Sequence, residues 1–316
     1  MMRIAITGAG GRLGRALLAA LEEAPFTGPF GPLAWSRPDY DLDDPSAAAR
    51  VVGRDTPEVV VHAAAWTDVD GCAREPGRAM RRNALAVAEL AAACAAAGTD
   101  LVLVSTNEVF DGRRTDGRGY ATGDRPAPGN PYGASKLAGE AAAQAAFLRR
   151  GSVLAAADGA VPAGPQLAIV RTAWLFGLPG NDFPGKILAA AERARAAGEP
   201  LRVVADEVGS PTYAPDLADA IVELLAAGAY AGFHHVVNAG AVSRAAWART
   251  ILAAARLDVP VAEVPLATWA RPSAVPAWAV LAPTPLPSGE PLRPWEAALA
   301  DYLPLLLRGR APVARS

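Results

Sequence analysis

Three glycines at intervals of three residues separate the first strand-like run of the chain from its first helix-like run. Residues 3–7 are apolar and β-rich, and residues 13–23 have the pattern of a helix. Gly8 permits a tight turn, Gly11 lets the backbone approach a pyrophosphate, and Gly14 lets the helix pack on the strand. Because the turn lies between a first strand and a first helix, it predicts a dinucleotide site at the N-terminus of that helix.

The alternation of strand and helix continues along the chain. Strands that alternate with helices imply right-handed crossovers and a parallel sheet covered on both faces. We therefore predict an α/β fold with a doubly wound, Rossmann-like parallel sheet and a smaller C-terminal substrate lobe. Apolar runs recur at 33–35, 59–62, 101–104 and 167–170, with helical segments near 46–53, 76–97 and 131–150 between them.

Beyond Arg171 the chain is richer in Pro and Trp, and the alternation loosens except for a predicted helix over 215–227 and a strand over 233–238. Residues 151–165, rich in Ala and Gly, are predicted to form a variable surface loop. The predicted domains are a dinucleotide-binding domain over 1–172, to which 216–240 return, and a substrate-binding lobe made of 173–215 and 241–316.

Charge and composition exclude several classes of partner. The formal net charge is −2, so the chain lacks the basic field that attracts nucleic acid or an anionic membrane. The sequence has no apolar run long enough to span a bilayer and no secretory signal pattern at its start. Cys72 and Cys94 form no CxxC pair, which favours a reduced setting. We expect a cytoplasmic monomer or homodimer with no metal site, since the acidic residues show no ligand spacing.

The residues after the second predicted strand bear on the choice of cofactor. A dinucleotide with free ribose hydroxyls usually meets an Asp or Glu there, but this chain has Trp35, Ser36 and Arg37. The planar guanidinium of Arg37 suits a 2′-phosphate, which favours NADPH and leaves NADH possible. Asp41 and Leu42 stand where the chain could pass the adenine.

A candidate catalytic set follows the fourth predicted strand. A spacing of four places Tyr132 and Lys136 on one face of a helix, and Thr106 ends the strand before it. Carbonyl reduction needs a proton donor, and a phenol is a poor one unless a neighbouring cation lowers its pKa. We predict Tyr132 as the general acid, Lys136 as the cation that tunes it and holds the nicotinamide ribose, and Thr106 or Ser105 as donor to the substrate carbonyl.

At these residues the chain resembles the extended short-chain dehydrogenase/reductases, and more closely the dTDP-4-dehydrorhamnose reductase family. The resemblance implies hydride transfer from NADPH or NADH to the 4-keto group of a dTDP-linked 6-deoxyhexulose. It covers nearly the full length and rests on the glycine turn, AAAWTDVD at 63–70, Asn83, STNEVFDG at 105–112, NPYGASKLAGE at 130–140, RTAWLFG at 171–177, DEVGSPT at 206–212 and LRPWEAALADYL at 292–303.

Position by position, the resemblance implies a catalytic set, a cofactor set and a sugar-side set. The catalytic set is Thr106, Tyr132 and Lys136. The cofactor set joins the residues argued from the motifs above to those that the resemblance implies. Its members are Gly8, Gly11, Arg12, Leu13, Gly14, Arg37, Asp41, Leu42, Ala63, Ala64, Ala65, Thr67, Asn83, Ser105, Tyr132 and Lys136. The substrate set is Asn107, Glu108, Trp174, Phe183 and Glu207, with the Trp174 indole either facing the sugar or packed as core under the lobe.

The sequence departs from the family pattern near the predicted sugar site. The family usually has Asp-Tyr after the catalytic Thr and Asp-Gln before Gly-x-Pro-Thr, whereas this chain has Asn107-Glu108 and Asp206-Glu207. The Arg-Pro-x-x-Ser-x-Leu-Asp segment is only partly present, from Arg271 onward, without its Ser and Asp. These departures leave open a relative with an altered substrate.

Two rival functions stay open at this stage. One is a non-catalytic NADP-binding regulatory subunit, which has no chemical need for both Tyr132 and Lys136. The other is a nucleotide-sugar epimerase or dehydratase, which would want an acid pair beside Thr106. Glu108 is one such acid, and Asn107 supplies none.

Overall fold

The computed structural model describes residues 1–158, 164–179, 181–228 and 230–310. A six-stranded sheet in the order β10-β5-β4-β3-β1-β2 forms its centre, and all its neighbouring strands are parallel. The predicted Rossmann-like parallel sheet is confirmed. Its strands are β1 Ile4–Thr7, β2 Leu33–Trp35, β3 Val59–His62, β4 Asp100–Thr106, β5 Leu167–Thr172 and β10 Gly232–His235.

Strand β1 lies between β2 and β3. The chain therefore places β2 on one side of β1 and then crosses to the other side of β1 to form β3. Thr7 pairs with Trp35 of β2 and with His62 of β3, which places the ends of these three strands side by side. In open α/β sheets, ligands bind at the carboxyl ends of the strands where the order reverses. The topology therefore predicts a cleft beside Gly8.

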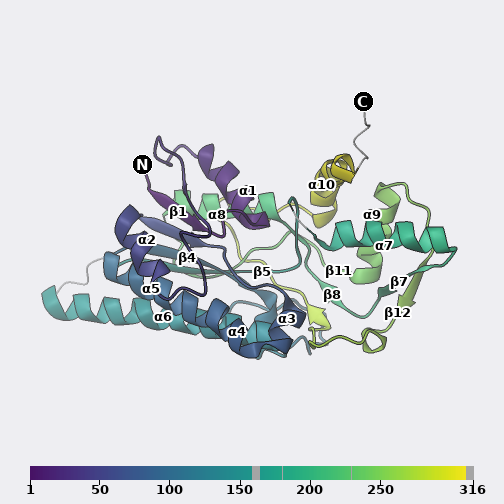
Figure 1. Ribbon diagram of the computed structural model, residues 1–316, viewed down its shortest axis with the longest axis horizontal. Coiled ribbons are helices and arrows are strands. Elements are labelled where there is room, and N and C mark those ends of the chain that lie inside the picture. The colour runs from purple at the N-terminus through teal and green to yellow at the C-terminus, as the bar shows by residue number, and fades with distance from the viewer. Residues whose placement is uncertain (159–163, 180, 229, 311–316) are drawn as a thin grey trace.

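Helices cover both faces of the sheet (Figure 1). Helices α1 (Arg12–Glu22) and α8 (Ala214–Ala227) pack on one face, and Leu13, Leu17 and Leu21 of α1 are buried there because a spacing of four keeps them on one side. The other face carries α2 (Ala47–Asp55), α5 (Ala86–Ala97) and α6 (Pro131–Asp158).

The predicted surface loop over 151–165 is wrong for its first part. Helix α6 continues through residues 151–158, where Ala is frequent and favours helix, while 159–163 lie outside the described residues. The helix predicted over 76–97 is interrupted: α4 (Pro76–Met80) is followed by a π-helical turn at Arg81–Leu85 before α5. A short helix, α3 (Val69–Arg74), precedes them.

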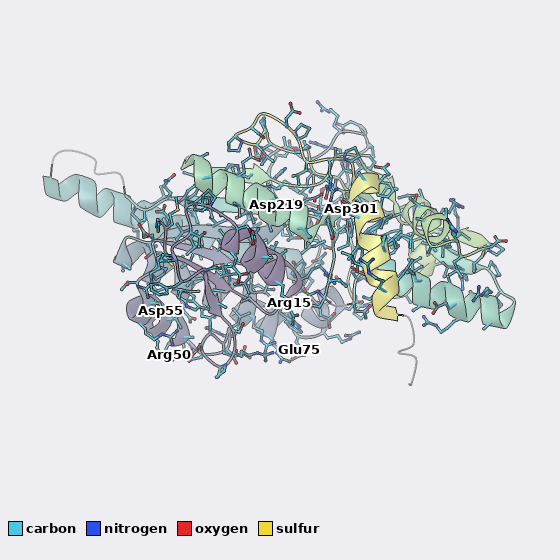
Figure 2. The ribbon with its side chains drawn as sticks, turned by 90° about the horizontal axis from the view of Figure 1, so that it is seen from above. Arg15, Arg50, Asp55, Glu75, Asp219 and Asp301 are labelled. Carbon is cyan, nitrogen blue, oxygen red and sulfur yellow. The ribbon has the colours of Figure 1, made fainter. Side chains whose placement is uncertain are left out.

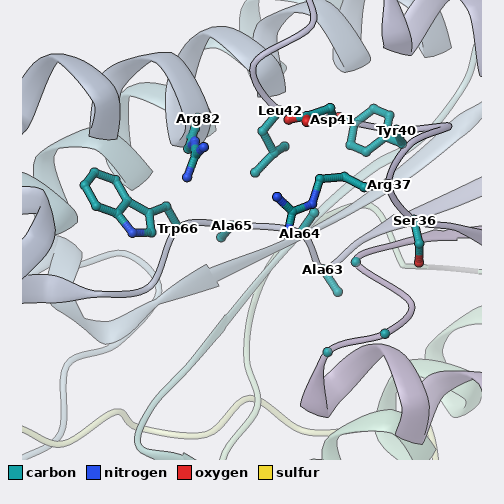
Figure 3. A pocket seen from close by; sticks show the side chains of 13 residues that line it. Ser36, Arg37, Tyr40, Asp41, Leu42, Ala63, Ala64, Ala65, Trp66 and Arg82 are labelled. Carbon is teal, nitrogen blue, oxygen red and sulfur yellow. The ribbon is translucent and has the colours of Figure 1, made fainter. Parts of the chain in front are cut away.

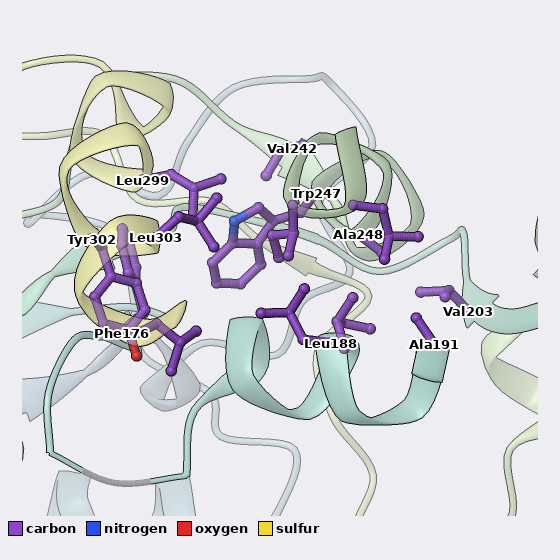
Figure 4. Packing of buried hydrophobic residues seen from close by; sticks show 14 of the residues in the cluster. Phe176, Leu188, Ala191, Val203, Val242, Trp247, Ala248, Leu299, Tyr302 and Leu303 are labelled. Atoms are coloured by element: carbon purple, nitrogen blue, oxygen red, sulfur yellow. The ribbon is translucent and has the colours of Figure 1, made fainter. Parts of the chain in front are cut away.

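A second hydrophobic core lies outside the sheet. Trp247 is fully buried at its centre, between α7 and α10, as Figure 4 shows. Helix α10 forms the side of the α7–α9 lobe that is nearer to the sheet, as both Figure 1 and the turned view of Figure 2 show. This lobe contains α7 (Phe183–Ala197), β7 (Leu201–Val204), α9 (Arg244–Ala254), β12 (Val261–Val264), η3 (Leu266–Thr268) and α10 (Trp295–Arg310).

Short strands connect the lobe to the sheet domain. Strand β8 (Val208–Gly209) pairs with β11 (Val242–Ser243) and β13 (Trp278–Ala279), and β6 (Leu175–Phe176) pairs with β9 (Thr212–Tyr213). We keep the predicted domain division as a proposal, since β10 joins the sheet and α10 joins the second core. No helix among the described residues is long and apolar enough to cross a membrane.

Candidate active site

A cavity of about 630 Å³ lies at the carboxyl ends of β1, β2 and β3. Gly8 has a φ of +66°, and a Cβ there would lie 2.9 Å from the backbone of Ala64. A Cβ on Gly14 would lie 2.2 Å from the Gly8 carbonyl oxygen. Position 8 therefore accepts only glycine, because any side chain there would collide with the backbone that follows β3. Gly14 lets α1 pack directly against the turn.

The wall of this cavity contains eight of the predicted cofactor residues: Gly8, Gly11, Arg37, Asp41, Leu42, Ala63, Ala64 and Ala65. It also contains Ser36, Tyr40, Trp66 and Arg82, which the sequence analysis did not assign to the site. Figure 3 shows Arg37 and Arg82 entering the cavity from different sides. Arg82 is paired with Asp43 and lies over the Trp66 ring, 5.8 Å from its centroid.

Other predicted cofactor residues are engaged elsewhere. Arg12 donates from Nε to the Gly177 carbonyl at 2.8 Å and from Nη1 to the Leu175 carbonyl at 3.3 Å, so it lines a second cleft instead. Thr67 lines that second cleft too. Arg12 therefore ties the glycine turn to the substrate lobe, a contact that its place in the motif did not indicate.

Asn83 and Ser105 are framework residues in this structure. Asn83 lies in the π-helical turn, accepts from the Trp66 amide at 2.8 Å and donates to the Trp66 carbonyl at 3.0 Å. It thereby fixes a residue of the cavity wall. The Ser105 hydroxyl donates to buried Glu140, so of the two predicted donors to a substrate carbonyl, the geometry favours Thr106.

The residues of this cavity fit a phosphorylated dinucleotide. No acidic side chain follows β2 directly, and Arg37 has no hydrogen bond or ion pair to any described residue. An unpaired guanidinium at this point suits a 2′-phosphate, whereas an acid there would repel it.

Replacing Arg37 by Ala is expected to reduce the preference for NADPH over NADH about 10- to 100-fold. The reason is that a hydrogen bond to a charged group contributes about 1.5–3 kcal/mol, and each 1.4 kcal/mol is about tenfold in affinity. The measurement is the Kd of each dinucleotide, from quenching of tryptophan emission. Equal losses for both dinucleotides would show that Arg37 does not contact the 2′-phosphate; Arg15→Ala, on the exposed side of α1, is the control.

The predicted catalytic side chains meet where β4 ends and α6 begins. Thr106 is the last residue of β4, and its hydroxyl lies close enough to the phenol of Tyr132, in the first turn of α6, to lower the pKa of that phenol. Asn130 caps this turn by accepting from the Gly133 amide at 2.8 Å. Tyr132 and Lys136 are 8% and 4% exposed, so the chemistry they serve is shielded from bulk water.

The expected lowering of the Tyr132 pKa by Lys136 is not seen. Burial and the nearby Glu108 carboxylate raise the pKa of Tyr132, and only the Thr106 hydroxyl lowers it. Lys136 instead donates from Nζ to the Val104 carbonyl at 2.8 Å. Tyr132 therefore keeps its proton at neutral pH, as a proton donor to an alkoxide must.

Burial lowers the pKa of Lys136 to about 8, although the Glu140 carboxylate favours its charged form. Lys136 is charged below this pKa and neutral above it, so reductase activity that needs the cation is expected to fall as pH rises through about 8. In Lys136→Arg the guanidinium does not titrate in this range, so the loss of activity is expected to move to higher pH. The measurement is kcat as a function of pH. If Lys136→Arg loses activity at the same pH as wild type, the titration belongs to another group.

A second cleft of about 800 Å³ lies between the sheet domain and the α7–α9 lobe. Six cationic side chains line it against three carboxylates. Asp70 pairs with Arg271 and Glu207 with Arg244, while Asp182 caps α7. The remaining cations are Arg12, Lys186, Arg193 and Arg202, none of which forms an ion pair within the described ranges. This charge suits an anionic ligand such as a diphosphate.

Trp174 lines this cleft, and its ring is in contact with Arg244. The Arg244 guanidinium lies 3.4 Å from the ring centroid, and a Cβ on Gly209 would lie 2.4 Å from the same ring. Arg244 and Gly209 therefore both pack against the ring, and the role of Trp174 as a sugar-side residue stays a prediction. Phe183 also lines the cleft, but it stacks on Trp247 at a centroid distance of 4.6 Å. The charged group that stands over these aromatic rings is Arg244, which sequence reasoning missed.

The three polar residues of the predicted substrate set lie in different surroundings. Asn107 is 4% exposed, its Oδ1 accepts from Thr106 at 3.3 Å, and its amide nitrogen has no partner in the described part of the chain. It therefore supports Thr106 instead of lining a cleft. Glu207 lies in the cleft wall and accepts from Arg244 at 2.8 Å. Glu108 is near enough to Glu207 for that carboxylate to raise the pKa of Glu108, and near enough to Tyr132 to raise the pKa of its phenol.

No cluster of three or more His, Cys, Asp or Glu residues that could hold a metal ion occurs within the described ranges. His62 is packed at the end of β3, with Nδ1 2.8 Å from the Thr7 hydroxyl.

Comparison with known proteins places this site among related enzymes. Residues 2–307 match the model of the RmlD substrate binding domain. A dTDP-4-dehydrorhamnose reductase of Mycobacterium tuberculosis is 38% identical over 308 residues, covering 95% of this chain and 92% of that protein. The dTDP-4-dehydrorhamnose reductase structure from Clostridium acetobutylicum matches with a TM-score of 0.84 and 30% identity, covering 97% of this chain and 100% of that one. That from Bacillus anthracis, in complex with NADP, matches with a TM-score of 0.82 and 31% identity over 96% and 99% of the two chains.

Proposed function

The chain belongs to the RmlD substrate binding domain family, and from this premise we propose that it is an NADPH-dependent reductase of a nucleotide-linked 4-keto-6-deoxy sugar. The substrate that fits best is dTDP-4-dehydrorhamnose or a close relative. The observation that supports this most is that Thr106, Tyr132 and Lys136 come together where β4 ends and α6 begins, and that Trp66 of the glycine-walled cavity packs against the cluster that contains Tyr132.

The two clefts have separate tasks in this proposal. The cavity at β1–β3 holds the dinucleotide, with Gly8 and Gly11 beside the pyrophosphate and Arg37 at the 2′-phosphate. The cationic cleft holds the nucleotide diphosphate of the substrate, for which Arg193 and Arg202 supply unpaired charge. The keto sugar then lies between them, beside Tyr132.

Bound NADPH supplies the hydride that reduces the ketone carbon. Negative charge develops on the ketone oxygen, where the Thr106 hydroxyl donates a hydrogen bond and Tyr132 delivers its proton. Lys136, anchored on the Val104 carbonyl, holds the nicotinamide ribose in this proposal, the second role that the sequence predicts for it. Burial of all three side chains strengthens these interactions by excluding water.

The test is the oxidation of NADPH, followed at the absorbance of its nicotinamide, when the purified protein meets a dTDP-linked 4-keto-6-deoxy sugar made enzymatically. Oxidation that requires the sugar, with an equimolar 4-hydroxy product by mass spectrometry, is the expected result. Binding of NADPH with no oxidation for any 4-keto nucleotide sugar would favour the non-catalytic NADP-binding subunit.

We also propose a cytoplasmic monomer or homodimer. Cys72 and Cys94 are both free and buried, which fits a reducing compartment. Measurement of the molar mass in solution by light scattering distinguishes the two oligomeric states.

A further inference from the structure

Glu108 is a titratable group that the proposed reduction does not use. It lies in η2 (Asn107–Val109), directly after Thr106, and its backbone amide donates to the Thr106 hydroxyl at 3.2 Å. The backbone there also contacts the start of α6, since a Cβ on Gly133 would lie 2.0 Å from the Glu108 carbonyl oxygen. The position of Glu108 is therefore fixed by the same turn that fixes Thr106 and Tyr132.

The Glu108 carboxyl has one oxygen held and one free. Oε2 accepts from Asn130 Nδ2, which also donates to the Ala274 carbonyl at 2.8 Å. Oε1 has no hydrogen-bond partner among the described residues, and the side chain is only partly buried. The free oxygen is thus available to a ligand and to exchange with water.

Three charged side chains lie near this carboxyl. Glu207, directly before β8, disfavours its ionised form, while Arg271, which is paired with Asp70, and Arg244 on α9 favour it. The Tyr132 phenol and the Cys72 thiol are its other titratable neighbours. Burial outweighs the two arginines, and the pKa of Glu108 is raised to about 7. A carboxyl that is half ionised at neutral pH both accepts and returns a proton readily.

We propose that Glu108 is a second proton-transfer group of this site, which removes and returns a proton at a carbon adjacent to the keto group of the bound sugar. This rests on the proposed function, because it needs the keto sugar beside Tyr132. The hydrogens next to a ketone are acidic, and their removal needs only a base and a site that binds the ketone oxygen.

The step balances without a cofactor. The C–H bond breaks, its proton passes to the Glu108 carboxylate, and its electron pair moves into the sugar to give an enolate on the ketone oxygen. The Thr106 hydroxyl and the Tyr132 phenol hydrogen-bond that oxygen, as they do in reduction. Return of a proton from Glu108 to the carbon restores the ketone, and exchange of the carboxyl proton with water at Oε1 replaces hydrogen by solvent hydrogen.

The experiment measures this exchange directly. The protein is incubated with the dTDP-linked 4-keto-6-deoxy sugar and NADP⁺ in D₂O, with no reductant, and deuterium next to the ketone is followed by mass spectrometry and located by NMR. Wild type is expected to incorporate deuterium at least about tenfold faster than a sample without protein, and faster as pH rises through about 7, since the carboxylate is the base.

Two variants separate proton transfer from charge. Glu108→Gln is expected to lower the ratio of exchange to NADPH-dependent reduction at least about tenfold, because the amide cannot accept the proton. Glu263→Gln is the matched control: it makes the same change at an exposed carboxylate that pairs with Arg249 away from both clefts, and it is expected to leave the exchange rate and its pH dependence unchanged. Circular dichroism and thermal melting confirm that both variants fold, and Glu108→Asp restores a carboxylate at the position.

The outcomes are distinct from those of the reductase test. A wild-type protein that reduces the sugar but incorporates no deuterium overturns this inference and leaves the proposed function standing, with Glu108 as a hydrogen-bond partner of a sugar hydroxyl. Equal exchange-to-reduction ratios in wild type and Glu108→Gln overturn it too. Failure of both reduction and exchange removes the proposed function and this inference together.

Discussion

Replacing Tyr132 by Phe is expected to lower kcat for ketone reduction by about 10²–10⁴-fold, the usual contribution of a positioned general acid. The change removes one oxygen from a buried side chain whose pKa is raised and which therefore holds its proton at neutral pH. Dinucleotide binding is expected to persist, because the cavity at β1–β3 does not include Tyr132. The measurements are steady-state NADPH oxidation with the keto sugar and the Kd of NADPH.

Thr106→Val is the partner experiment. It removes the hydroxyl that lies near the Tyr132 phenol and lowers its pKa, and it keeps the shape of the side chain. If the two hydroxyls act on the same oxygen, the double variant should lose less than the product of the two single losses. A Tyr132→Phe protein with unchanged kcat would show that the proton comes from another group, and Glu108 would then be the first candidate.

Replacing Arg171 by Met is expected to lower the free energy of unfolding by about 3–5 kcal/mol, since it leaves a buried carboxylate without its cation. Arg171 on β5 and Glu140 on α6 are each 2% exposed in their side chains and form a two-bonded pair, at 3.1 Å and 2.7 Å. The guanidinium also lies over the Phe233 ring, 4.6 Å from its centroid. The measurement is urea unfolding of wild type and variant.

The double variant Glu140→Leu/Arg171→Met tests the cause. Removing both charges leaves no unpaired ion, so the double variant is expected to be more stable than Arg171→Met alone. It is also expected to lower the pKa of Lys136 further, because the Glu140 carboxylate favours the charged lysine. A double variant less stable than either single one would mean that packing of these side chains, not their charge, dominates.

The sheet and the glycine turn were predictable because their signals are local. A strand, a turn and a helix are adjacent in sequence, and the side-chain periods of 2 and 3.6 residues are visible in short windows. The same holds for Tyr132 and Lys136, four residues apart on α6. The error over residues 151–158 was local too, since an Ala-rich stretch with Gly at its edges was interpreted as a loop.

The candidate site was less predictable wherever a side chain has a distant partner. Arg12 stands inside the glycine motif, yet its guanidinium binds carbonyls some 165 residues later, at Gly177. Trp174 was assigned either to the sugar or to the core, and Arg244, far along the chain, covers its face. No pattern near these residues indicated these contacts.

The sequence by itself determined the fold class, the place of the dinucleotide turn and the identity of the candidate catalytic trio, because each depends on spacing within one or two elements. The tertiary structure alone decided the charges and contacts around them. Lys136 binds the Val104 carbonyl instead of lowering the pKa of Tyr132, and Glu108 comes near Glu207 across about a hundred residues of chain. Burial and Coulomb interactions depend on distance in space, which the order of residues does not specify.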